Sequence, residues 1–178
     1  MKQRVLDVKD RRLREKSQPV IKVDKKIKSI IKDIKDTLAT QNDPEGVGLA
    51  APQIGKNLCI FLINYEKISR IIINPKVLYK SKSKSHSTKA SRGGKEILEG
   101  CLSLPHYYGP LQRAKAIKIE YLTEAGEKKV EEFKGFLAQI IQHEIDHLDG
   151  ILFIDRILEQ KKPLYKFEGG EWEKVDLV

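Results

Sequence analysis

Apolar residues recur at three- and four-residue intervals after Asp24, the spacing that places them on one face of an α-helix. Asp24 is a suitable N-cap residue, because its side chain can accept a hydrogen bond from a free backbone N–H of the first turn. Lysines occupy the other faces, so we expect an amphipathic helix that covers a sheet. The apolar positions are Ile27, Ile30, Ile31, Ile34 and Leu38.

Three short apolar segments follow a break that is rich in Gly, Pro, Asn and Asp. They cover residues 49–54, 58–63 and 68–73, and we predict a strand for each. Further on, residues 117–121 alternate apolar with charged side chains, and a turn over residues 124–127 leads to Val130. This alternation predicts an antiparallel hairpin.

The apolar period becomes helical again after Gly135 and stops at Gly150, a residue type that commonly ends helices. We therefore predict a C-terminal helix with one broad apolar surface. Its apolar positions are Phe136, Leu137, Ile140, Ile141, Ile145 and Leu148.

Length and composition favour a single globular domain. The chain has 178 residues, of which 40% are apolar and 33% charged, and we expect one domain over residues 1–178. The longest unbroken apolar run has six residues, whereas a membrane-spanning helix needs about 20, so we expect no membrane segment. The first ten residues match no targeting peptide, and two cysteines are too few for a disulfide scaffold. These features favour a cytoplasmic, bacterial-type protein, with an organellar origin left open.

The net charge of +9 is unevenly distributed. Residues 1–40 hold 13 Lys or Arg against 6 Asp or Glu, and residues 76–95 add seven basic residues without an acid. Clustered cations could dock on a ribosome, although a solvated helix face is the more common explanation. Because no aromatic motif interleaves with the lysines, we expect no DNA binding. Residues 80–94 predict a mobile basic loop, and residues 159–178 a short C-terminal tail.

The strongest chemical signal is an H-E-x-x-H pattern inside the predicted C-terminal helix. His143 and His147 lie four residues apart, so both imidazoles can reach one metal ion from the same helix face. Glu144 projects to one side, where it can act as a base without binding the ion. Two packing histidines beside an incidental glutamate are the alternative explanation.

Two histidines leave a catalytic metal ion short of a third protein ligand. Cys101, which lies between two turns that contain glycine, can supply that ligand and leave one coordination position open for water. Cys59 differs, because it lies within a run of apolar residues and is better explained as a small buried side chain. Residues 46–55 form a third segment, in which small residues would let a ligand backbone approach and Gln53 is a polar group in an apolar context. Tight strand packing is the alternative for that segment.

Three segments, in this order, resemble the motifs of the peptide deformylase family. Residues 46–53 resemble G-x-G-L-A-A-P-Q, residues 99–103 resemble E-G-C-L-S, and residues 142–147 resemble Q-H-E-x-D-H. The match is complete at all three, whereas the basic loop at 80–94 and residues 105–108 depart from the commonest pattern. The resemblance implies an α+β fold in which antiparallel strands pack around a C-terminal metal-binding helix, with a second amphipathic helix near the N-terminus.

The resemblance also implies an activity, which is hydrolysis of the formyl group from nascent polypeptides that begin with formyl-methionine, with release of formate. Cys101, His143 and His147 would bind one divalent metal ion, expected to be Fe²⁺, which Zn²⁺ or Ni²⁺ can replace. Glu144 would be the general base and acid. Gln53 and the backbone N–H of Leu102 would stabilise the developing oxyanion.

Selectivity is expected to come from the same segments. The peptide backbone is expected to lie against Val47, Gly48 and Gly100, where the glycines leave room for it. One or two turns before His143, the helix can present side chains that floor a pocket for methionine, with core packing as the alternative; these are Phe136, Gln139 and Ile140. By resemblance, Glu99 and Arg113 can pair to hold the cysteine loop. Asp146 can either accept an N–H from a ligand imidazole or face water.

Two other functions remain open at this point. An endopeptidase can use the same H-E-x-x-H pattern and would cleave internal peptide bonds. A non-catalytic metal-binding or ribosome-binding module would coordinate the ion with four protein ligands, leave no position for water and show no turnover.

Overall fold

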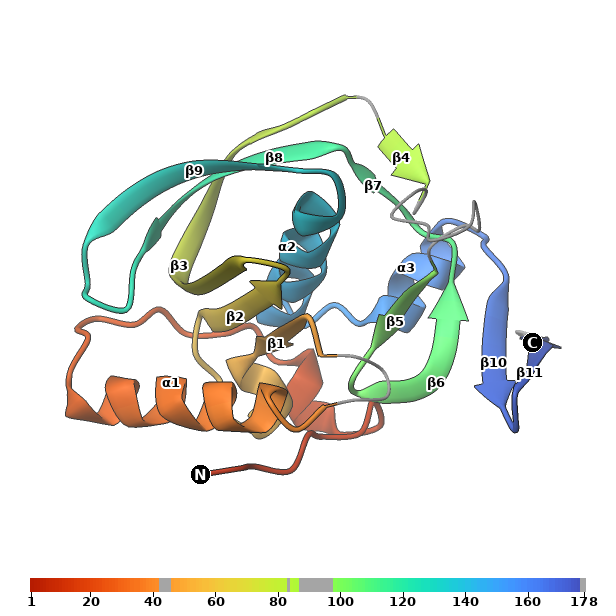
Figure 1. The fold of residues 1–178 in the computed structure, drawn as a ribbon, viewed down its shortest axis with the longest axis horizontal. Helices are drawn as coiled ribbons and strands as arrows, with labels where there is room; N and C mark the ends of the chain where they lie inside the picture. Colours follow the sequence, from red (N-terminus) through yellow and green to blue (C-terminus); the bar gives the residue numbers. More distant parts are fainter. Residues whose placement is uncertain (42–45, 83, 87–97, 177–178) are drawn as a thin grey trace.

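The computed structural model describes residues 1–41, 46–82, 84–86 and 98–176. Helix α1, Lys25–Leu38, is the predicted N-terminal amphipathic helix, and the Asp24 carboxylate caps it by accepting the N–H of Ile27. It runs along one side of the molecule (Figure 1). A 3₁₀ turn, Arg11–Arg14, precedes it and buries Leu13.

Five antiparallel strands form the larger sheet in the order β1-β2-β3-β8-β9. The predicted hairpin is confirmed as β8 and β9, which pair from Ala116↔Lys134 to Leu122↔Lys128. The strands are β1 (Gly48–Ala50), β2 (Ile60–Tyr65), β3 (Ile68–Lys80), β8 (Ala116–Leu122) and β9 (Lys128–Lys134).

Strand β2 is apolar from Ile60 to Ile63 because helices cover both faces of this part of the strand. Ile60 and Leu62 belong to a cluster with the apolar face of α1, whereas Phe61 and Ile63 belong to a second cluster with the C-terminal helix. Successive side chains of a strand point to opposite faces, so this strand contributes to two cores. Because both faces are buried, the apolar residues of this strand form an unbroken run in the sequence.

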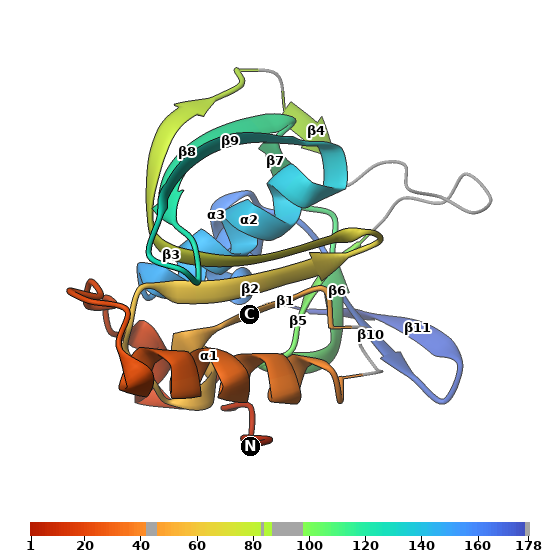
Figure 2. The same cartoon turned by 60° about the vertical axis from the view of Figure 1, so that its left-hand side comes forward.

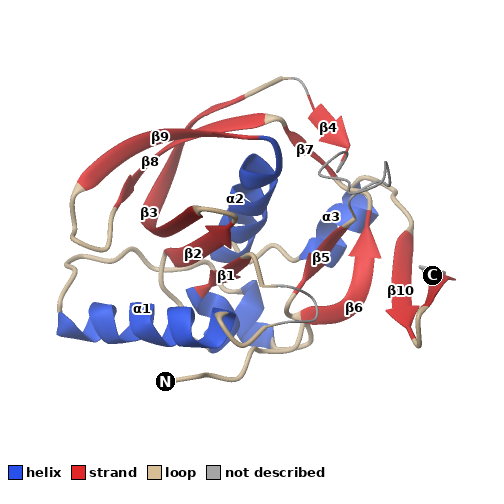
Figure 3. Cartoon of the chain, in the orientation of Figure 1, coloured by secondary structure: helices blue, strands red, loops and turns tan. Residues whose placement is uncertain are grey.

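Helix α2, Gly135–Leu148, is the predicted C-terminal helix, and it lies inside the curved sheet. It contacts β1, β2, β8 and β9, and strands β8 and β9 arch over it (Figure 2). Figure 3 shows the helix surrounded by strands. This arrangement buries most of the helix and brings its residues opposite the end of β1, which confirms the expected α+β class.

A second sheet has the order β11-β10-β6-β5 and packs against helix α3, Phe153–Glu159. A third apolar cluster joins them and includes Cys101, Leu111 and Ile157. The strands of this sheet are β5 (Glu99–Cys101), β6 (Leu104–Gly109), β10 (Leu164–Glu168) and β11 (Glu171–Val175). A separate pair consists of β4 (Lys84–His86) and β7 (Gln112–Ala114).

The strand predicted over residues 49–54 needs correction. Strand β1 ends at Ala50, and a 3₁₀ turn, Ala51–Ile54, follows. Pro52 lacks the N–H that a ladder requires, and Gly55 has a φ of +73°, which ends the turn. The turn places Gln53 inside the molecule.

Two other segments also differ from expectation. Within the predicted loop at 80–94, Lys84–His86 pair with β7, while residues 83 and 87–94 lie outside the described residues. The expected tail at 159–178 instead contains the β10–β11 hairpin, which joins β6 through Tyr165↔Tyr108. Within the described ranges, no helix is both long and apolar enough to cross a membrane.

Candidate metal centre and cavity

The two histidines of the H-E-x-x-H pattern lie side by side on α2. Their ring centroids are 4.9 Å apart, and both residues are buried. One helical turn separates them, so the helix itself sets the distance between the two imidazoles. The Nδ1–H of His143 donates to Glu99 Oε1 at 2.8 Å, which leaves Nε2 of that ring with a lone pair for a metal ion.

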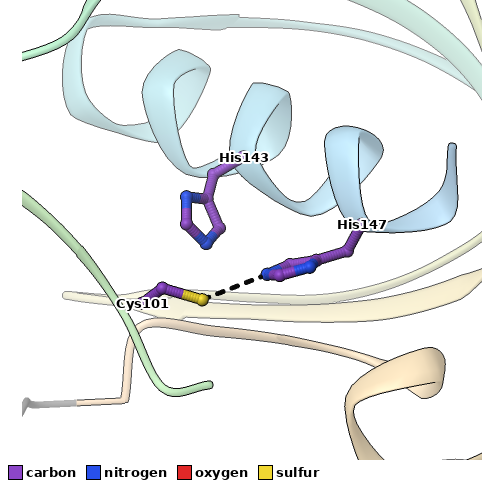
Figure 4. Close-up of side chains that lie close together, drawn as sticks. All are labelled: Cys101, His143 and His147. Atoms are coloured by element: carbon purple, nitrogen blue, oxygen red, sulfur yellow. Dashed lines mark hydrogen bonds between the residues drawn. The ribbon is translucent and has the colours of Figure 1, made fainter. Parts of the chain in front are cut away.

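Cys101 approaches the histidines from the end of β5. The register between β5 and β6 shifts after Gly100, so that Cys101 pairs with Leu104 and the chain turns back sharply. Its Sγ lies 3.3 Å from His147 Nε2, and all three side chains point toward one another (Figure 4). The donor atoms of Cys101, His143 and His147 lie within 4.8 Å of one another.

The charges of this cluster suit a divalent transition metal. Burial alone would raise the pKa of the Cys101 thiol, but the imidazoles of His147 and His143 bring that pKa well below its usual range. A thiolate and two imidazoles are a common donor set for such ions. His147 Nδ1 is buried and has no hydrogen-bond partner among the described residues. The triad therefore fits a single bound ion.

Glu144 lies beside the triad in a nearly dry environment. Burial raises the pKa of its carboxyl group to about 7. Its Oε2 has no hydrogen-bond partner within the described part of the chain. A Cβ added to Gly48 would lie 2.3 Å from Glu144 Oε1, so β1 approaches this carboxylate more closely than any other residue type at 48 would allow. The carboxylate is therefore in position to hold a water molecule or a substrate proton.

Gln53 reaches the same place from the 3₁₀ turn. Its Oε1 accepts the N–H of Ala50 at 2.9 Å, which fixes the amide group. Its Nε2 lies 3.1 Å from Ser103 Oγ and 3.8 Å from Cys101 Sγ. Leu102 borders the same cavity and packs against the core beneath α1.

A cavity of about 330 Å³ opens beside the triad. Its lining includes every residue that the sequence predicted to bind the substrate, together with Gln53, Leu102 and Glu144. Sequence reasoning missed Tyr65, Leu98 and Tyr108, which also line it. Tyr65 could have been found only from a contact, since its ring packs edge-on against Phe136 with centroids 4.8 Å apart. The predicted substrate residues in the lining are Val47, Gly48, Gly100, Phe136, Gln139 and Ile140.

Buried ion pairs hold the cysteine strand against α2. Arg113 donates two hydrogen bonds to Glu99, at 2.6 and 3.1 Å, and a third to Asp146 at 2.6 Å. Arg156 of α3 also binds Asp146. The expected Glu99–Arg113 pair is therefore present, whereas Asp146 binds arginines and Glu99 takes the imidazole N–H.

Gln142, the first residue of the third motif, anchors α2 to β7. Its Oε1 accepts the N–H of Ala114 at 3.1 Å, and its Nε2 donates to the Ala114 carbonyl at 3.0 Å. A side-chain amide can thus replace a strand neighbour at this edge. The anchor fixes the helix at the turn that carries His143.

Fold and site together define an α+β metalloprotein in which a helical H-E-x-x-H pattern and a cysteine from a strand share one metal site beside a cavity. The chain belongs to the polypeptide deformylase family, whose model matches residues 2–163, and this family hydrolyses N-formylmethionyl peptides. It is 44% identical to peptide deformylase 2 of Clostridium acetobutylicum over 155 residues, which are 86% of this chain and 93% of that protein.

Solved structures agree with the sequence relatives. The crystal structure of peptide deformylase from Thermotoga maritima has a TM-score of 0.78 and 34% identity, and the match covers 88% of this chain and 97% of that one. A Met-Ala-Ser-bound class I type b peptide deformylase from Acinetobacter baumannii also has a TM-score of 0.78, with 29% identity over 88% of this chain and 99% of that one.

Proposed function

We propose that this protein removes the formyl group from nascent polypeptides that begin with formyl-methionine, using Glu144 as general base and acid. The observation that carries the proposal is the convergence of Cys101, His143 and His147 beside a cavity that also contains Glu144. A divalent ion held by the three ligands would act as a Lewis acid and lower the pKa of bound water toward about 7. Fe²⁺ is the proposed ion, with Zn²⁺ or Ni²⁺ able to replace it.

The protein's own groups would then move one proton and stabilise one charge. Glu144 would accept a proton from the water that attacks the formyl carbon and deliver it to the departing amine as the C–N bond breaks. The products would be formate and a free N-terminus. The Gln53 amide and the N–H of Leu102 would donate hydrogen bonds to the carbonyl oxygen as it gains charge.

The cavity wall would select the substrate. Gly48 and Gly100 line the cavity without a side chain and would let a peptide backbone lie close to them. A Cβ added at either position would collide with the protein itself, with Glu144 at position 48 and with Tyr108 at position 100. Phe136, Gln139 and Ile140 would contact the methionine side chain from α2. A formyl position too tight for acetyl would discriminate by about 1 to 3 kcal/mol, the usual effect of one methyl group.

The test is a formate-release assay on formyl-Met-Ala-Ser and acetyl-Met-Ala-Ser, with mass spectrometry of the remaining peptide. We expect formate from the first peptide, slow or absent release of acetate from the second, and an intact internal sequence. Cleavage at internal bonds would support the endopeptidase instead. If the protein binds one metal ion per chain but shows no turnover, the result would support the non-catalytic metal-binding or ribosome-binding module.

Replacing Glu144 tests the proposed base directly. Glu144→Gln keeps the shape of the side chain, so we expect it to retain bound metal while kcat falls by about 10²- to 10⁴-fold. Glu159→Gln, at an exposed position on α3, is the matched control and should behave as the wild type. Unchanged kcat in Glu144→Gln would remove this residue from the mechanism.

Replacing Cys101 tests the third ligand. Cys101→Ala should lose stoichiometric metal after anaerobic purification, as measured by elemental analysis. Cys59→Ala is the control, because the Cys59 thiol donates to the Ser17 carbonyl, away from the triad. Full metal occupancy in Cys101→Ala would place the third ligand elsewhere. The same analysis of the wild type identifies the native ion.

We also propose a cytoplasmic site of action and docking on the ribosome, where nascent substrates appear. The exposed lysines of α1 are one surface with suitable charge, although Lys32 and Lys35 are paired with Asp36 and Glu124. Docking through counterion release would weaken steeply with salt. Co-sedimentation with ribosomes at increasing salt tests it, and Lys25→Glu with Lys28→Glu should reduce the bound fraction.

A further inference from the structure

The β10–β11 hairpin lies beyond residue 163, where the family model ends. It extends the sheet that carries Cys101, because Tyr165 of β10 pairs with Tyr108 of β6, and Tyr108 pairs with Gly100 of β5. An added structural element therefore connects directly to one wall of the cavity. Figure 1 shows this hairpin beside β6.

The two faces of the hairpin differ in their neighbours. Leu164 and Val175 pair across the strands and belong to the apolar cluster that includes Ile157 of α3. Phe167 and Trp172 also pair across the strands, but each lies three positions along its strand from Leu164 or Val175 and so projects from the opposite face. The hairpin is thus held in place by one face, and its aromatic face is not needed for that packing.

The aromatic face continues the cavity wall toward solvent. The ring of Trp172 meets Tyr108 edge-on with centroids 5.4 Å apart, and it lies 4.8 Å from Phe167. Tyr108 lines the cavity, and its ring lies so close to Gly100 that a Cβ there would be 2.8 Å from it. The three rings form a continuous row in which Trp172 lies between Tyr108 of the cavity wall and Phe167, and Trp172 is 55% exposed.

A tryptophan that leaves half of its surface in water indicates a binding surface more often than a core. Trp172 is the only tryptophan in the chain, and its ring contacts both Tyr108 and Phe167. Aromatic rings provide apolar area with little loss of side-chain entropy and are enriched where partners bind. A peptide whose formylated end reaches the triad must leave the cavity past its walls, and Tyr108 is one of them.

We propose that Tyr108 and Trp172 form an apolar subsite that binds the side chain of a substrate residue downstream of the formyl-methionine. This inference rests on the proposed function and adds a preference for an apolar residue after the first position. Phe167 packs against Trp172. Trp172 would act in substrate binding and not in the chemical step.

Trp172 fluorescence gives a direct test, because no other tryptophan contributes to the signal. The wild-type protein with bound metal is titrated with the deformylated peptide Met-Ala-Phe-Ala and, in parallel, with Met-Ala-Ala-Ala. Isomers that carry Phe at position two or four are included. We expect a saturable change in emission for at least one Phe peptide, at concentrations that match its inhibition constant. Inhibition by every peptide without any change in emission would overturn the proposal.

Kinetics with variants tests the preference itself. Wild-type kcat/KM for the formylated Phe peptides should exceed that for formyl-Met-Ala-Ala-Ala by about 2- to 10-fold at the position that contacts the row, the size expected for one aromatic contact. Trp172→Ala should remove this difference through KM, with kcat changed less than about 2-fold. Trp172→Phe should restore part of it. Glu173→Ala, on the neighbouring residue of β11, is the matched control and should keep it.

The outcomes separate this proposal from the proposed function. Failure of the wild type to release formate from any peptide would contradict the function. Normal turnover of formyl-Met-Ala-Ala-Ala with the same Phe preference in Trp172→Ala would contradict only the subsite. An equal fall of kcat for all peptides in Trp172→Ala, together with lost metal, would show a purely structural role for the hairpin and would also overturn the subsite.

Discussion

At the scale of single residues, position 48 leaves no room for a side chain beside Glu144. The Gly48→Ala substitution would add a methyl group 2.3 Å from Glu144 Oε1 and 3.0 Å from a methyl group of Ile140. The carboxylate would have to move, whereas the three metal ligands would not. We expect kcat to fall by more than about 10-fold with metal content unchanged, because a misplaced catalytic group is costly even at about 1 Å.

The control for that prediction is a glycine far from the site. Gly126 lies in the β8–β9 turn with a φ of +83°, and an added Cβ would find ordinary contacts at 3.7 Å. Gly126→Ala should lower the free energy of unfolding by about 1 kcal/mol through backbone strain, with normal formate release. If both variants lost stability and activity in parallel, the effect of Gly48→Ala would be ascribed to folding.

At the scale of elements, α1 depends on its first turn. The helix has no acidic residue in that turn, so the Asp24 side chain is its main N-terminal support. Asp24→Ala should lower the free energy of unfolding by about 1 kcal/mol, measured by urea denaturation. Asp36→Ala, which removes exposed pairs with Lys32 and with the N-terminal ammonium group, should change stability far less. Equal effects of the two substitutions would argue against a role for the cap.

At the scale of the whole molecule, Arg113 links the parts that form the metal site. It joins β5 through Glu99 and α2 through Asp146, and its side chain is only 7% exposed. Arg113→Ala would remove the positive charge that pairs with the buried carboxylates of Glu99 and Asp146. We therefore expect the free energy of unfolding to fall by about 3 to 5 kcal/mol. Arg156→Ala removes a more exposed partner of Asp146 and should cost less. A smaller effect of Arg113→Ala than of Arg156→Ala would contradict this ranking.

Metal removal is a second prediction at this scale. An ion that binds the folded chain alone stabilises it by linkage, so a chelator should lower the melting temperature of the wild type. Cys101→Ala should melt at the same temperature with and without chelator, since its triad is incomplete. A chelator effect of wild-type size in this variant would show that the stabilising ion binds elsewhere.

Much of this architecture could be predicted because its signals are local. The apolar spacing of α1 and α2, the Asp24 cap and the alternation of β8 depend on residues within one or two turns of one another. The four-residue spacing of His143 and His147 likewise placed both imidazoles on one side of a predicted helix. Local rules failed after Ala50, where Pro52 and Gly55 convert an apolar run into a turn.

By itself, then, the sequence determined the two long helices, the hairpin and the three segments that carry the chemical groups, because each follows from periodicity or from residue type. Only the tertiary structure decided that Cys101 reaches His147, that Glu99 binds His143, and that Tyr108 meets Trp172. These pairs are separated by dozens of residues, and their contacts depend on strand register and on how the sheets and helices pack together. Periodicity within a segment carries no information about such distances, so folding alone sets them.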